Sequence, residues 1–181
     1  MTLAVARLDA SREPDLLRVL ACEEGCAWCS CVAWHLDTWE GFGERSAADN
    51  RALRDELFAR GAHDGYLAYD RGGAPVGWCQ AAPSAALAKV AREHPDASAD
   101  TWAIGCFVVP PAHRRRGVAR ALLAGVLADL PARGARRVLA FPKRGVDEPG
   151  ELWNGPEPLF VEAGFRVARD DAVRPVLELD L

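Results

Sequence analysis

A cluster of arginines beside a glycine is the part of this sequence best suited to chemistry. Arg114, Arg115 and Arg116 are followed by Gly117 and by a small residue, Ala119. The arginines carry positive charge, and glycine lets a ligand approach the backbone closely. A helix that starts here would add unpaired backbone N–H groups and the positive end of its dipole. These features predict a binding site for a phosphate or pyrophosphate group.

The flanking residues place this turn between a strand and a helix. The run Ile104–Val109 is apolar and rich in β-branched residues, which is typical of a buried strand. Pro110 and Pro111 end it, because neither can donate a hydrogen bond to a neighbouring strand. An apolar run to about Leu130 then predicts a helix. The turn matches neither a Walker-type loop nor a G-x-G-x-x-G dinucleotide turn. The alternative is a solvated arginine cluster that caps an ordinary helix.

The length and composition predict one cytoplasmic domain. The chain has 181 residues, and half of them are hydrophobic. No apolar run approaches the ~20 residues of a membrane span, and the first residues do not resemble a secretory signal. We therefore expect no membrane partner.

Charge is distributed unevenly along the chain. Residues 1–100 carry 10 Lys and Arg against 16 Asp and Glu, whereas residues 101–181 carry 12 against 10. A basic second half suits a polyanionic cofactor, and an acidic first half suits a cationic amine, although uneven surface charge is an equal alternative. Because the basic residues concentrate in one turn rather than along a face, we expect no nucleic-acid partner.

The rest of the chain alternates between predicted strands and helices. Ser46 is a suitable N-cap for one helix, which Gly61 ends. The pattern predicts an α+β fold with a mixed sheet of six to seven strands flanked by helices. The expected strands are 2–8, 65–70, 75–80, 104–109, 136–142, 165–168 and 173–179. The expected helices are 14–22, 47–60, 118–130 and 156–163, and residues 83–94 form a short helix or a loop.

Three segments resemble those of a known family. Arg114-x-x-Gly117-x-Ala119 after a strand resembles the R/Q-x-x-G-x-G/A signature of the GNAT superfamily of acetyl-CoA-dependent acyltransferases. Phe160–Phe165 resembles the family's Y-x-x-x-G-F segment, and Val76-Gly77-Trp78 resembles one of its strands. The resemblance covers most of the chain. It implies one GNAT domain over 1–181, with acceptor-side helices in 1–64 and the sheet and CoA-binding core in 65–181.

This resemblance also implies an activity. We expect transfer of an acetyl group from acetyl-CoA to an amine of a small molecule, directly within a ternary complex, by a monomer or a homodimer. The backbone of Phe107 and Val109 would pair with the pantetheine arm. The cofactor-binding residues that the resemblance implies are Phe107, Val108, Val109, Arg114, Arg115, Arg116, Gly117, Val118, Ala119 and Arg120.

The catalytic acid and base depart from the family pattern. The usual tyrosine acid, four residues before the glycine of G-F, is replaced by Phe160, which carries no acidic proton. Cys106 on the central strand is a candidate substitute donor; the alternatives are that it is an inert buried cysteine and that the leaving thiolate takes its proton from water. His35 is the preferred base, since its pKa lies near the working pH. Four carboxylates are further candidates: Glu23, Glu24, Asp37 and Glu40.

Four cysteines lie within ten residues: Cys22, Cys26, Cys29 and Cys31. They suit packing or pocket lining beside tryptophans, metal or redox chemistry, or substrate contact, and these interpretations remain open. Zinc is not favoured, because the run holds only one C-x2-C pair. The alternative function is a non-catalytic CoA-binding module whose cysteines sense metal or redox state. The expected pocket residues are Trp28, Cys29, Trp34, Cys79 and Phe160.

Overall fold

The computed structural model describes residues 3–146 and 148–181. Within them, a seven-stranded mixed sheet has the order β1-β2-β3-β4-β5-β7-β6. Neighbouring strands are antiparallel except β4 and β5, which are parallel. The strands are β1 (Ala4–Arg7), β2 (Gly65–Tyr69), β3 (Pro75–Pro83), β4 (Thr101–Val108), β5 (Arg137–Ala140), β6 (Arg166–Arg169) and β7 (Val176–Asp180).

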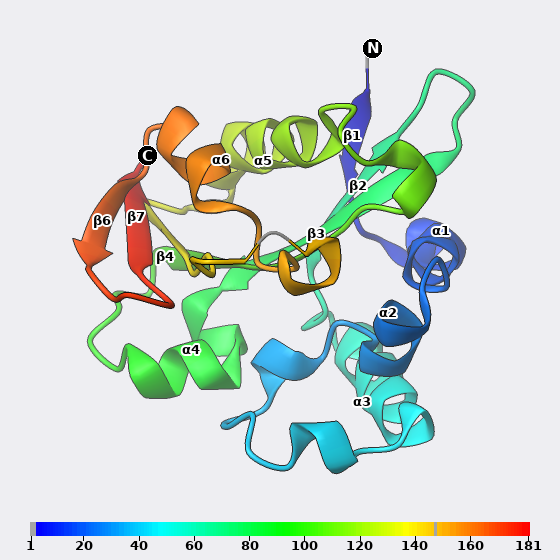
Figure 1. Cartoon of the computed structure of the whole chain (residues 1–181), viewed down its shortest axis with the longest axis horizontal. Helices are drawn as coiled ribbons and strands as arrows, with labels where there is room; N and C mark the ends of the chain where they lie inside the picture. Colours follow the sequence, from blue (N-terminus) through cyan, green and yellow to red (C-terminus); the bar gives the residue numbers. More distant parts are fainter. Residues whose placement is uncertain (1–2, 147) are drawn as a thin grey trace.

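Helices cover both faces of this sheet (Figure 1). On one face α5 packs against β1, β2 and β3, and α6 lies beside it. On the other face α1 packs against β3, and α2, α3 and α4 lie on the same side. Each face therefore has its own apolar cluster. The helices are α1 (Glu13–Leu20), α2 (Glu24–Cys29), α3 (Ala47–Ala59), α4 (Ala88–Glu93), α5 (Val118–Asp129) and α6 (Glu157–Glu162).

The sheet opens in the middle, between β4 and β5. Their parallel pairing ends at Ile104 and Ala140, and β4 continues for four more residues to Val108. A β-bulge lies at the same point, because Gly105 and Cys106 face the single residue Gln80 of β3. A bulge redirects side chains and increases local twist. The end of β4 therefore has a free edge and an altered direction.

The predicted α+β architecture is confirmed. The structure adds detail where the sequence pattern was weak: β4 begins at Thr101, α4 forms within 83–94, and α2 forms within the cysteine-rich segment. The cap at Ser46 is present as a capping box with Asp49. Thr2, in the first expected strand, lies outside the described residues. No helix of the described residues is long and apolar enough to cross a membrane.

Candidate active site

The turn between β4 and α5 forms an open cradle of backbone N–H groups. Gly117 precedes α5 with a φ of +80°, a conformation that L side chains rarely adopt. A Cβ atom at Gly117 would meet no atom of the described residues within 4 Å. The first N–H groups of α5 have no acceptor within the helix. With the exposed Arg115 and Arg116 beside it, this turn fits a pyrophosphate group.

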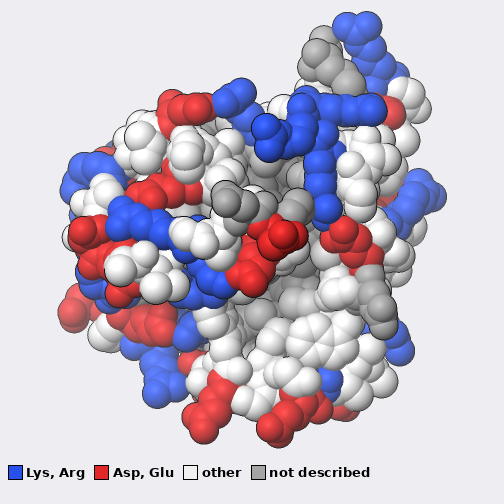
Figure 2. All heavy atoms as spheres, in the orientation of Figure 1, with Lys and Arg blue, Asp and Glu red and all other residues white. Residues whose placement is uncertain are grey.

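Two of the predicted cofactor arginines have protein partners. The Nε of Arg114 donates to the carbonyl oxygen of Val109 at 3.0 Å, and a terminal nitrogen donates to the carboxylate of Glu23 at 2.7 Å. Arg120 pairs with Glu162 of α6. Arg114 therefore joins the end of β4 to the residue that precedes α2. Figure 2 shows Lys and Arg surface near the start of α5, above a hollow at the centre of the same face.

The free edge of β4 is partly covered by the loop before α6. The N–H of Phe107 donates to the carbonyl oxygen of Trp153 at 2.6 Å. The side-chain amide of Asn154 donates to the carbonyl oxygen of Gly105 at 3.2 Å. In this conformation the N–H of Phe107 is therefore not free to pair with a pantetheine arm, contrary to the expectation.

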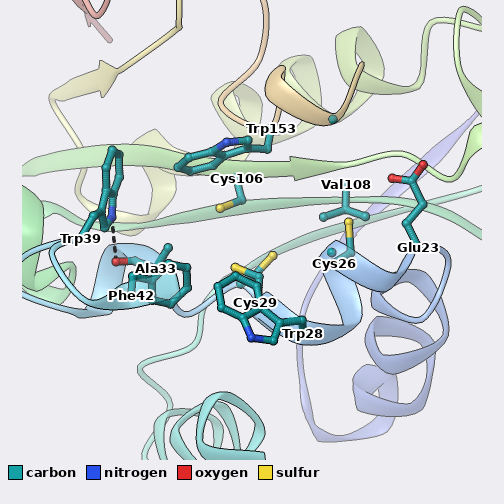
Figure 3. Close-up of a pocket in the computed structure, with 13 residues that line it drawn as sticks. Glu23, Cys26, Trp28, Cys29, Ala33, Trp39, Phe42, Cys106, Val108 and Trp153 are labelled. Atoms are coloured by element: carbon teal, nitrogen blue, oxygen red, sulfur yellow. Dashed lines mark hydrogen bonds between the residues drawn. The ribbon is translucent and has the colours of Figure 1, made fainter. Parts of the chain in front are cut away.

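A cavity of about 410 Å³ lies between α2, β4 and the loop that carries Trp153 (Figure 3). Small-molecule sites commonly span about 300–1,000 Å³, so this cavity is large enough to hold a substrate. Four aromatic residues and four cysteines form much of its wall: Trp28, Trp39, Phe42, Trp153, Cys26, Cys29, Cys31 and Cys106. The other lining residues are Glu23, Gly25, Ala33, Val108 and Gly150.

Hydrogen bonds to the backbone hold the aromatic wall in place. The indole N–H of Trp28 donates to the carbonyl oxygen of Arg45 at 2.9 Å. The indole N–H of Trp39 donates to the carbonyl oxygen of Ala33 at 3.1 Å. Trp28 also contacts Phe42, with ring centroids 4.9 Å apart. Because both indole N–H groups already have acceptors, the rings offer the cavity mainly their carbon atoms.

Burial keeps the cavity thiols protonated. Removal from water raises the pKa of Cys26 to about 12 and that of Cys29 to about 11. A hydrogen bond to Cys106, together with burial, raises the pKa of Cys31 well above its usual value. The same hydrogen bond lowers the pKa of Cys106, but burial and the neighbouring thiols outweigh it and raise that pKa overall. All four thiols are therefore neutral at physiological pH.

The bulge in β4 places Cys106 in the cavity, opposite the end of α2. Ser30 and Cys31 follow α2 with φ values of +51° and +52°, which turn the chain sharply after the helix. This turn brings the thiol of Cys31 beside that of Cys106. Cys106 lines the cavity as a neutral thiol, a group that can donate a hydrogen bond.

His35 lies outside the cavity lining. Its Nδ1 is 3.2 Å from the carbonyl oxygen of Ala86, and its Nε2 is 3.1 Å from the amide nitrogen of Gln80. These partners require a neutral ring that donates from Nδ1 and accepts at Nε2. Burial lowers the pKa of His35 to about 4. The structure therefore corrects the expectation that His35 is the catalytic base.

The expected pocket residues divide into two groups. Trp34, Cys79 and Phe160 are buried in the core and do not line the cavity. Phe160 packs edge-to-face against Phe165, with ring centroids 5.4 Å apart, so the position of the family's tyrosine is a packing position here. The remaining two expected residues, Trp28 and Cys29, line the cavity.

Glu23 is the only acidic residue in the lining formed by the described side chains. Its carboxylate is partly exposed and is paired with Arg114. Asp37 and Glu40 are exposed and do not contribute to the lining. The side chain of Glu24 lies outside the described part of the chain. Of the three candidate carboxylates whose side chains are described, Glu23 is therefore the one that the fold brings to the cavity.

Three of the four clustered cysteines, Cys26, Cys29 and Cys31, line the cavity, whereas Cys22 is not among the lining residues. Over residues 3–146 and 148–181, no group of three or more His, Cys, Asp or Glu side chains is arranged to hold a metal ion. All six cysteines are free thiols. The zinc interpretation and the metal-sensing alternative therefore gain no support, and pocket lining is the role that the geometry favours.

Sequence reasoning missed part of the aromatic wall. Phe42, Trp39 and Trp153 line the cavity but are not among the pocket residues expected from the sequence. Trp153 lies between Gly150 and Gly155, and a large aromatic residue within a glycine-rich loop is a signal that could have identified it. Only the folded chain brings this loop opposite α2.

Comparison with known families agrees with this geometry. The family model described as acetyltransferase (GNAT) family matches residues 28–148. The chain belongs to this family. The matched region includes much of the cavity wall and the whole arginine-rich turn, but ends before Trp153. As a GNAT protein, the chain is an acetyl-CoA-dependent acetyltransferase. No curated protein matches it.

Solved structures share the GNAT fold along almost the whole chain. A GCN5-related N-acetyltransferase from Kribbella flavida is 18% identical with a TM-score of 0.59, and the match covers 99% of this chain and 98% of that one. A GNAT acetyltransferase from Brucella melitensis, in complex with acetyl-CoA, is 15% identical with a TM-score of 0.56, covering 99% and 88%. The PaiA N-acetyltransferase from Thermoplasma acidophilum, in complex with coenzyme A, is 12% identical with a TM-score of 0.55, covering all of both chains. At these identities, the likeness establishes the fold.

Proposed function

We propose that this GNAT protein transfers an acetyl group from acetyl-CoA to the amine of a small molecule, directly within a ternary complex. The observation that carries the proposal is that an anion cradle adjoins a cavity large enough for a small molecule. Val108, at the end of β4, lines the cavity, and the chain then continues into the turn that ends at Gly117. The ion pair between Arg114 and Glu23 ties the turn to the cavity rim.

The turn supplies groups suited to the phosphates of acetyl-CoA. The backbone N–H groups from Gly117 to Ala119 would hold the pyrophosphate, and Arg115 and Arg116 would add positive charge. When bound, acetyl-CoA supplies the acetyl group as a thioester that an amine can attack. The fit rests on the open cradle at Gly117.

The cavity supplies groups for the proton movements. An amine is mostly an ammonium ion at neutral pH, so it must lose a proton before it can attack. The carboxylate of Glu23 at the rim would accept that proton, directly or through water. Cys106 is neutral and lines the cavity, so its thiol would donate a hydrogen bond to the sulfur that leaves. The apolar wall would limit water around the reacting atoms.

The substitution Gly117→Glu tests the cofactor site. A carboxylate in the cradle would repel the phosphates, so we expect acetyl-CoA affinity, measured by calorimetry, to fall at least about 100-fold, which is about 2.7 kcal/mol. Gly134→Glu is the matched control, because Gly134 has a φ of +83° and similarly open surroundings but lies beyond the far end of α5. Unchanged affinity in Gly117→Glu, with the wild type binding, would exclude the proposed cradle.

A further inference from the structure

We infer that the acceptor is a monoamine with an aromatic or branched aliphatic body, and that this body fills the cavity beneath Trp153. The inference rests on the proposed function and goes further by naming the substrate class. It follows from the neutrality of the cavity wall, from the support behind its aromatic rings and from the single carboxylate at its rim.

Among the described residues that line the cavity, Glu23 is the only charged one. Its four thiols are protonated, because burial or hydrogen bonding raises the pKa of each. The other described lining side chains are aromatic or aliphatic, or are absent at glycine. A substrate group that enters this cavity loses its contacts with water and gains contacts with carbon and sulfur atoms. An apolar body gains free energy from that exchange, whereas a hydroxyl or a second ammonium group loses its hydrogen bonds.

Charged side chains support the aromatic wall from outside the lining. The Nζ of Lys89 lies 4.5 Å from the ring centroid of Trp39, and the guanidinium of Arg174 lies 4.9 Å from it. Trp39 in turn contacts Trp153 edge-to-face, with centroids 5.5 Å apart. Figure 3 shows Trp39 and Trp153 at one side of the cavity, across from Glu23. This wall is therefore formed before any substrate binds, which lowers the entropy cost of binding.

The single carboxylate suits a substrate with one ammonium group. Glu23 lies at the end of the cavity nearest Val108 and Cys26, while the aromatic rings lie farther along (Figure 3). A monoamine can place its nitrogen near Glu23 and its apolar body among the rings. A polyamine or an aminosugar would bury further polar groups with no partner in the described lining. Sites of this kind reject extra polar groups because desolvation is not compensated.

An apolar acyl chain is the competing occupant of the same space. An acyl chain, however, is uncharged, so the carboxylate of Glu23 at the cavity rim would not help to bind it. Varying the acyl donor and the acceptor separately distinguishes the two occupants, because only one series should show a strong dependence on apolar size.

The test measures CoA release by the wild-type protein with matched amines. The acceptors are 2-phenylethylamine, 3-methylbutylamine, spermidine, glucosamine and a peptide with an N-terminal alanine, all with acetyl-CoA as the donor. We expect kcat/KM for the first two to exceed that for the other three by about 100-fold, as burial of one apolar side chain allows. With 2-phenylethylamine as the acceptor, kcat/KM for the acyl donor should decline as the acyl chain lengthens from acetyl-CoA to octanoyl-CoA.

A pair of variants at Phe42 links the preference to the cavity. Phe42 is half-buried in a surface loop, so its replacement leaves the core intact. We expect Phe42→Asn to raise KM for 2-phenylethylamine about 10-fold with little change in kcat. KM for ethylamine should not change, because ethylamine has almost no body to bury. Phe42→Leu keeps an apolar side chain, so it should raise KM for 2-phenylethylamine less than Phe42→Asn does.

Contrary results would overturn the substrate class, the occupant of the cavity or the proposed function, depending on which experiment gives them. A preference for spermidine, glucosamine or the peptide, or an equal effect of Phe42→Asn on all amines, would overturn the inferred substrate class. A preference for octanoyl-CoA would assign the cavity to the acyl chain instead. Failure of the wild type to bind acetyl-CoA would refute the proposed function itself, and calorimetry detects this independently of turnover.

Discussion

At the scale of single residues, the buried His63 and the partly buried His35 couple this protein's stability to pH. His63 is stacked on Trp78, with ring centroids 5.7 Å apart and planes inclined by 2°, and it lies 5.8 Å from His35. Burial, with a smaller contribution from His35, lowers the pKa of His63 to about 3, and burial lowers the pKa of His35 to about 4. Both rings are therefore neutral in the folded protein across the physiological range.

Acidification should destabilise the protein below pH 6.5. The unfolded chain binds protons at both histidines near pH 6.5, whereas the folded protein does so only near pH 4 and below. The stabilisation is therefore complete above pH 6.5 and is lost as the pH falls. At pH 5 each histidine should lower the free energy of unfolding by about 2 kcal/mol, measurable by urea denaturation. His63→Phe keeps a stacked ring and should remove about half of this loss; an unchanged pH dependence would contradict the assignment.

Residue type and local sequence were enough to predict the role of some site residues but not of others. The role of Gly117 could be inferred from its neighbours in the sequence, because a glycine that precedes a helix within a basic turn indicates a phosphate-binding site. His35 could not be judged in this way. Its usual pKa suggested a base, but burial and two hydrogen-bond partners, Ala86 and Gln80, come from segments far away in the sequence.

At the scale of elements, the cavity depends on how α3 supports α2. Asn50 of α3 is fully buried, and its amide donates to the carbonyl oxygen of Trp28 at 3.0 Å. Its side-chain oxygen accepts from the Nε of Arg45 at 2.7 Å. The carbonyl oxygen of Arg45 in turn accepts the indole N–H of Trp28. One asparagine thus positions both the backbone and, through Arg45, the ring of a cavity residue.

Asn50→Ala should disturb both stability and acceptor binding. The change leaves buried polar groups without partners, which should lower the free energy of unfolding by about 2–3 kcal/mol. Because Trp28 then loses its support, KM for the amine should rise, while acetyl-CoA affinity should stay within about threefold.

Ser46→Ala is the matched control in the same helix. It removes the cap that bonds the N–H of Asp49 and should cost about 1 kcal/mol without raising KM. An equal change in KM in both variants would mean that general loosening of α3, rather than the contact with Trp28, controls acceptor binding.

At the scale of the whole molecule, the two halves of the chain meet at the ion pair of Glu23 and Arg114. These residues are 91 positions apart, and their side chains join the cavity rim to the phosphate turn. The division into acceptor-side helices in 1–64 and a CoA-binding core in 65–181 remains a prediction. The cavity, however, uses both parts, since Trp153 and Cys106 face the end of α2 (Figure 3).

Glu23→Gln should separate acceptor chemistry from cofactor binding. An amide cannot accept the proton of an ammonium group, so kcat/KM for the amine should fall by 10-fold or more in steady-state assays. Acetyl-CoA affinity should change by less than about threefold, because the backbone cradle remains. Glu162→Gln is the control, since Glu162 pairs with Arg120 on the outer surface. Equal losses in both variants would argue against a specific role for Glu23.

The sequence by itself determined most of the strands and helices along the chain, the arginine-glycine turn and the family. These features depend on local periodicity, on prolines and glycines, and on a motif that spans six residues, so neighbouring positions carry the information. The bulge that places Cys106, the contact between Cys31 and Cys106, the loop that brings Trp153 to the cavity and the pairing of Arg114 with Glu23 were decided only by the tertiary structure. Each depends on segments that are distant in sequence and on burial, which shifts pKa values and satisfies hydrogen bonds only after the whole chain has packed.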